Sequence, residues 1–144
     1  MLRILSVVAF IVMVVGIVWQ FYAGALFGPS PAGIAVQVLA VALMLWARLT
    51  FGKRSFHAAA NPTDGGIVTS GPYAFVRHPI YAAAIYFVWA GALQHRTAAA
   101  FGGASLVTIG GIMRMLLEER LLVSRYPAYR AYMGRVRRVV PFIV

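Results

Sequence analysis

The stretch that decides the fold is residues 4–27, which read ILSVVAFIVMVVGIVWQFYAGALF. Only Ser6 and Gln20 interrupt this apolar run with polar side chains of any size. The run is longer than the apolar core of a secretory signal peptide, which has roughly 7–15 residues, and it suits the about 20 residues that cross a bilayer. The stretch therefore predicts a retained transmembrane helix.

Three further apolar runs follow, at residues 32–50, 79–94 and 97–117. Residues 28–31, Gly-Pro-Ser-Pro, break the chain after the first run, so the first two spans are expected to form a helical hairpin. The third run is short for a span. We expect an all-α membrane protein, one domain over residues 1–144, with about four transmembrane helices. A polar loop is expected over residues 51–79, and an amphipathic, helical interfacial tail over residues 118–144.

The composition agrees with a membrane protein. Hydrophobic residues make up 62% of the chain and charged residues 11%, whereas a soluble domain carries about 25% charged residues. A folded, water-soluble monomer is thereby excluded. The chain has no cysteine, which excludes disulfides and thiolate sites. Three scattered histidines and one aspartate make a poor metal site, so no metal is predicted.

Positive charge dominates, with 13 Lys and Arg against 3 Asp and Glu and a net charge of +10. Because the bases flank long apolar runs, they predict anionic lipid headgroups as the partner and not nucleic acid. With four spans, every base except Arg96 falls on the side of both termini. The positive-inside rule then predicts that both termini, and the residues able to do chemistry, are cytoplasmic.

The first cluster of such residues lies in residues 71–81, GPYAFVRHPIY. Its prolines fix their own backbone angles and favour extended geometry in the residues before them. The stiff segment presents Tyr73, Arg77, His78 and Tyr81 where the third span begins. Two interpretations follow from this pattern alone: a catalytic site, or a belt of interfacial anchors without chemistry.

The second cluster comprises Arg114, Glu118 and Glu119 at the end of the fourth run. Arg114 and Glu118 are four residues apart and share a helix face, and Glu119 lies on a neighbouring face. The structural alternative is a charge cluster that only ends the span. Arginine alone would serve that purpose, and charged groups at membrane depth are functional by default, so the two glutamates favour function.

Three blocks, in this order, resemble the isoprenylcysteine carboxyl methyltransferase family: residues 68–81 (VTSGPYAFVRHPIY), residues 114–122 (RMLLEERLL), and a tyrosine-rich tail that ends at residues 139–143 (VVPFI). The resemblance implies an integral membrane methyltransferase. It would use S-adenosylmethionine at the cytoplasmic face and take a lipophilic methyl acceptor from the bilayer.

The resemblance also implies roles for the matching residues. Arg114 would position an acceptor carboxylate, and Glu119 would accept a proton if the acceptor is an amine or thiol. Which glutamate contacts the cofactor stays open. The residues implied to bind the cofactor are Tyr73, Arg77, His78, Pro79, Tyr81, Glu118 and Glu119.

Two departures from the family pattern bear on the cleft and the substrate. Ala83 stands where the family has glycine, which implies a tighter cofactor cleft. Residues 125–129, RYPAY, lack the two acids of the family's tail. The resemblance therefore supports the family's cofactor more strongly than it supports the family's substrate.

The favoured acceptor is the carboxylate of an isoprenylcysteine-like or other lipid. Phospholipid N-methylation and small-thiol S-methylation need the same cofactor and are the nearest alternatives, and the oligomeric state is undetermined. A small four-helix drug transporter would need an acid within residues 4–27, which have none. A non-catalytic basic membrane adaptor would explain the arginine-rich tail but neither cluster.

Overall fold

The structure is a computed structural model, and it describes residues 2–52 and 66–140. Part of the predicted polar loop and residues 141–144 lie outside this description. The described chain is all-α, as predicted, and contains no strand. The helices are α1 (Leu2–Tyr22), α2 (Pro31–Phe51), the short 3-10 helix η2 (Gly71–Ala74), α3 (Pro79–His95), α4 (Ala98–Arg125) and α5 (Ala128–Arg135).

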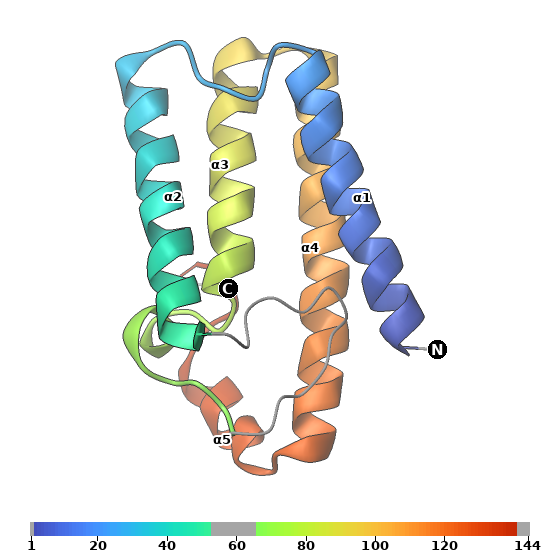
Figure 1. The fold of residues 1–144 in the computed structure, drawn as a ribbon, viewed down its shortest axis with the longest axis vertical. Helices are drawn as coiled ribbons and strands as arrows, with labels where there is room; N and C mark the ends of the chain where they lie inside the picture. The colour runs from blue at the N-terminus through green and yellow to red at the C-terminus, as the bar shows by residue number, and fades with distance from the viewer. Residues whose placement is uncertain (1, 53–65, 141–144) are drawn as a thin grey trace.

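Three helices of the described chain, α1, α2 and α4, are long and apolar enough to cross a membrane. Together with the composition, they make this an integral membrane protein. Helix α3 has 17 residues, which gives a length of about 26 Å, and it lies between α2 and α4 in the bundle (Figure 1). The count of four spans stays a prediction.

The predicted hairpin of the first two spans is wrong. Helix α1 packs along α4 and α2 packs along α3, so α3 and α4 separate the first two helices (Figure 1). The reason is that α1 ends at Tyr22, before the predicted residue 27, which leaves residues 23–30 free to pass over the end of α3. Gly91 permits this passage, because a Cβ there would lie 2.5 Å from the carbonyl oxygens of Ala25 and Leu26.

Helix α4 also departs from the prediction at its far end. It continues without a break to Arg125, so residues 118–125 belong to this helix and not to a separate tail. Residue 127 is the first proline after Leu117, and proline is the residue that ends helices most strongly. The extension carries the second cluster on a rigid helix to the end of the bundle.

Small residues of α4 let α1 approach closely. A Cβ on Gly103 would lie 2.9 Å from the carbonyl oxygen of Gly16, and one on Gly110 would lie 2.6 Å from that of Ala9. Helices in lipid pack through such contacts. At Gly102, in contrast, a Cβ would meet nothing within 4 Å. Two of the small residues in the fourth run therefore serve packing within the chain.

We expect Gly110→Ala to destabilise the protein by about 1–3 kcal/mol, since a methyl group would push α1 away from the backbone of α4. Gly102→Ala is the matched control on the same helix, and it should leave stability unchanged or raise it by up to about 1 kcal/mol, because alanine is the better helix former. Thermal unfolding in detergent micelles measures both. Equal melting temperatures for the two variants would contradict this packing.

Candidate active site

The two clusters predicted from the sequence lie together at one end of the bundle. Pro79 is the first residue of α3, so Arg77 and His78 directly precede this helix and face the end of α4. Arg77 Nη2 lies 2.9 Å from Glu119 Oε1, and His78 Nε2 lies 3.1 Å from the same oxygen. The stiff segment and the two glutamates therefore form one charged cluster.

Glu119 is the centre of this cluster and is only 4% exposed. Arg77 Nε donates to Oε1 at 3.0 Å, and Arg138 donates to Oε2 through Nε at 3.0 Å and through Nη2 at 2.9 Å. A buried carboxylate is expensive unless it is paired and hydrogen-bonded. Here two guanidinium groups and an imidazole engage both of its oxygens.

Glu118 is more accessible, with a side chain that is 23% exposed. Its Oε1 accepts hydrogen bonds from the Tyr81 hydroxyl and from Arg114 Nη2, the latter at 3.3 Å. Its Oε2 lies 3.9 Å from His78 Nδ1 and accepts no hydrogen bond from the part of the chain that the structure describes. Of the two glutamates, Glu118 thus has accepting capacity left for a ligand.

Arg114 lies inside the bundle, 4% exposed, and links three helices. Its Nε donates to Tyr81 Oη at 2.7 Å and its Nη1 to the Ser6 carbonyl of α1 at 3.4 Å. The guanidinium carbon also lies 5.2 Å from the centre of the Phe10 ring. With Nη2 on Glu118, all three nitrogens of Arg114 already have partners within the protein.

The site includes a segment that sequence reasoning assigned to lipid headgroups. Residues 136–140, here called the C-terminal strap, run beside the stiff segment. The Arg77 amide donates to the Arg137 carbonyl at 2.7 Å, and the His78 amide donates to the Arg138 carbonyl at 3.0 Å. Val76 and Arg137 form an isolated parallel bridge. These bonds place Arg138 beside Glu119.

Two tyrosines of the predicted interfacial tail are buried in the protein. Tyr129 and Tyr132, on α5, are 3% and 4% exposed. Burial raises the pKa of the Tyr132 hydroxyl to about 12, so it is protonated at neutral pH, and it donates to the Tyr73 carbonyl. Helix α5 is thereby fastened to the stiff segment.

The remaining predicted residues shape the site without touching the carboxylates. Tyr73 is buried in η2, and its ring centroid lies 5.6 Å from that of Phe51. Pro79 is fully buried at the start of α3. Tyr81 differs from these two residues, because its hydroxyl bonds Glu118 while its ring lies 5.8 Å from the His78 ring.

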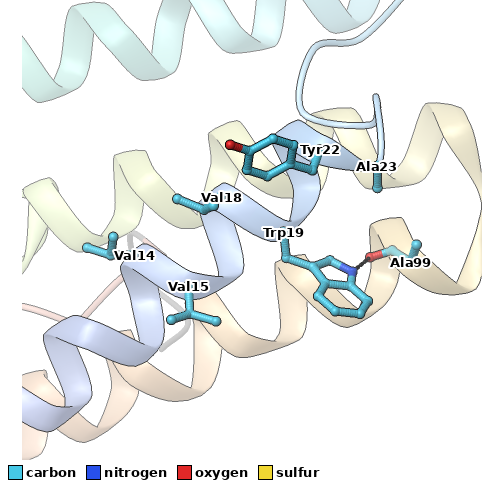
Figure 2. Close-up of a pocket in the computed structure, with 7 residues that line it drawn as sticks. All are labelled: Val14, Val15, Val18, Trp19, Tyr22, Ala23 and Ala99. Atoms are coloured by element: carbon cyan, nitrogen blue, oxygen red, sulfur yellow. Dashed lines mark hydrogen bonds between the residues drawn. The ribbon is translucent and has the colours of Figure 1, made fainter.

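An apolar groove lies away from this cluster, at the opposite end of α1. The α1 side chains there face outward, and Trp19 Nε1 donates to the Ala99 carbonyl of α4 at 3.1 Å (Figure 2). The groove has no charged group to bind or activate a reactant. Its lining residues are Val14, Val15, Val18, Trp19, Tyr22, Ala23 and Ala99.

Residues 33–124 match the family model described as "Isoprenylcysteine carboxyl methyltransferase (ICMT) family". The match covers well over half of the chain and contains both clusters. It ends before the C-terminal strap and Arg138. No curated protein and no solved structure matches the chain.

Proposed function

Since this chain belongs to the isoprenylcysteine carboxyl methyltransferase family and is a membrane methyltransferase, we propose that it methylates the carboxylate of a lipophilic acceptor with S-adenosylmethionine. We place the reaction at the cytoplasmic face, at the charged cluster around Glu118 and Glu119. Isoprenylcysteine-like and other lipid carboxylates are the proposed acceptors.

The observation that carries the choice of a carboxylate acceptor is that Glu119, the residue predicted to accept a proton, has both of its carboxylate oxygens bonded. Glu119 is paired with two arginines and Glu118 with Arg114, while His78 Nε2 contacts Glu119. An amine or thiol acceptor must lose a proton to a base on methylation. A carboxylate is already ionised near neutral pH and needs none. The paired site therefore favours ester formation over N- or S-methylation.

When bound, S-adenosylmethionine would supply a methyl group on a positively charged sulfur, and transfer to a carboxylate oxygen leaves a neutral ester and a neutral thioether. Opposite charges attract more strongly where the dielectric constant is low, so a site at the membrane boundary holds the ionic reactants together. Much of the rate gain in such a displacement comes from positioning. The rigid ends of α3 and α4 provide that positioning.

The accepting oxygen of Glu118 fits the amino-acid end of this cofactor. Glu118 Oε2 accepts no hydrogen bond within the described residues, so it suits an ammonium group or ribose hydroxyls. Glu119, predicted to take a proton, would have to leave Arg77 and Arg138 to do so. We therefore assign Glu119 to holding these arginines, and Arg114, predicted to position a carboxylate, to holding Glu118 and Tyr81.

The charge distribution supports the cytoplasmic placement. Arg3 lies in the first turn of α1 and Arg48 in the last turn of α2, which puts both at the end of the bundle that carries the site. Arg96, between α3 and α4, lies at the other end. Within the described residues the basic side chains thus gather on the side of the site, and basic ends of membrane proteins face the cytoplasm.

The test is to incubate membranes that contain the protein with methyl-labelled S-adenosylmethionine and three acceptors: an S-prenylated N-acetylcysteine, a phosphatidylethanolamine and a lipophilic thiol. We expect the label to enter the prenylated acid as a methyl ester. Alkali should then release the label as volatile methanol, because an ester is cleaved in this way and a methylated amine or thiol is not. Membranes with Glu119→Gln serve as the control. Alkali-stable label in the amine or the thiol would contradict the proposal.

A further inference from the structure

Arg138 differs from the other arginines of the charged cluster in its accessibility. Within the described structure, Arg77, Arg114 and Arg138 pair with Glu118 or Glu119. The side chains of Arg77 and Arg114 are 7% and 5% exposed, whereas that of Arg138 is 40% exposed. Arg138 is thus the paired guanidinium that a ligand entering the site can reach.

The pairing with Glu119 fixes how Arg138 is oriented. Two nitrogens, Nε and Nη2, bond the carboxylate along one edge of the guanidinium plane. The hydrogen bonds to Glu119 raise the pKa of Arg138 above its ordinary value, so the group is always charged. Its Nη1 donates to no atom of the described chain. Within the described residues, the second edge, formed by Nη1 and the outer hydrogen of Nη2, is therefore free of partners, and the pairing with Glu119 holds it in place.

The backbone gives Arg138 a fixed position as well. The His78 amide donates to the carbonyl of Arg138 at 3.0 Å. This hydrogen bond holds the backbone of Arg138 beside the stiff segment. The neighbouring Arg137 is exposed, and its side chain has no partner in the described structure. Arg137 therefore lacks the orientation that Arg138 has.

We propose that the free edge of Arg138 is a carboxylate-binding subsite. Guanidinium edges of this kind bind carboxylates through two parallel hydrogen bonds. The inference rests on the proposed function, in which the methyl acceptor and the amino-acid end of the cofactor both carry a carboxylate. Either carboxylate has the chemistry that this edge recognises. Glu119 acts in the subsite as the positioning residue that holds Arg138.

The experiment measures binding to the full chain in detergent by calorimetry, with two pairs of probes. One pair is S-adenosylhomocysteine and its decarboxylated analogue, and the other is an S-prenylated N-acetylcysteine and its carboxamide. The variants are Arg138→Gln, Arg138→Lys and the matched control Arg137→Gln. Arg138→Gln should fold, because Arg77 and His78 still pair with Glu119, and thermal unfolding checks this.

We expect Arg138→Gln to weaken binding of the acid of one pair about 10- to 100-fold and to leave binding of its carboxyl-free partner unchanged. Arg138→Lys should retain part of the preference for the acid, and Arg137→Gln all of it. The pair that responds identifies the source of the carboxylate, the cofactor or the acceptor.

Equal weakening of an acid and its carboxyl-free partner would show a structural role for Arg138 and overturn the inference, and so would unchanged binding of both acids. The methanol-release assay keeps the proposed function separate. A wild-type protein that forms no ester, yet prefers acids through Arg138, would overturn the proposed function and support the subsite.

Discussion

Replacing Glu119 with glutamine is expected to abolish methyl transfer, with a loss of at least about 1000-fold, and to lower the free energy of unfolding by about 3–5 kcal/mol. The carboxylate is 4% exposed and pairs with Arg77, His78 and Arg138. An amide in its place would leave two guanidinium groups without a counter-charge and turn its own N–H donors towards them. Label transfer in membranes and denaturant unfolding in detergent measure the two effects.

Arg120→Gln is the matched control, since Arg120 follows Glu119 on the same helix and is exposed. Its side chain has no partner within the described structure, so we expect wild-type stability and near wild-type turnover. A Glu119→Gln protein as stable as the Arg120→Gln protein would show that the ion pairs around Glu119 contribute nothing to the fold.

Replacing Glu118 with glutamine should separate chemistry from stability. We expect turnover to fall about 100-fold or more, because the charge that faces the cofactor is lost. The free energy of unfolding should change by about 1 kcal/mol or less. The side chain is 23% exposed, and the amide oxygen of glutamine can still accept from Tyr81 and Arg114. Steady-state kinetics with varied S-adenosylmethionine, together with unfolding in detergent, tests this prediction.

Two results would count against that assignment. Unchanged turnover would show that the Glu118 charge takes no part in binding or transfer. A loss of stability as large as that of Glu119→Gln would make Glu118 a structural residue. Glu118→Asp is a useful companion, because it keeps the charge and shortens the reach of the carboxylate by one methylene group.

Much of the helical content could be predicted from the sequence, because apolar runs and breakers are local signals. Ser30 caps α2 and Pro31 opens it, and Pro79 opens α3. The order of the helices in the bundle could not be predicted. Ser6 and Gln20 mark the face of α1 that is buried, but lipid is as apolar as a helix interface, so the pattern does not identify the helix that this face meets.

Contacts within the candidate site could be predicted where the two residues lie close together in the sequence. Arg114 and Glu118 are four residues apart, and their ion pair follows from helix geometry alone. Arg138 was missed because 19 residues separate it from Glu119 and several similar arginines compete for the same carboxylate. The run of bases at residues 135–138 was a signal for a cationic segment. It did not indicate which base turns inward.

The backbone pairing between the stiff segment and the C-terminal strap makes the site depend on residues beyond the apolar helices. Helix α4 ends at Arg125, whereas the strap supplies Arg138, one of the guanidinium partners of Glu119. A chain truncated after residue 135 should therefore still insert into the membrane with all its apolar helices, yet transfer no methyl group.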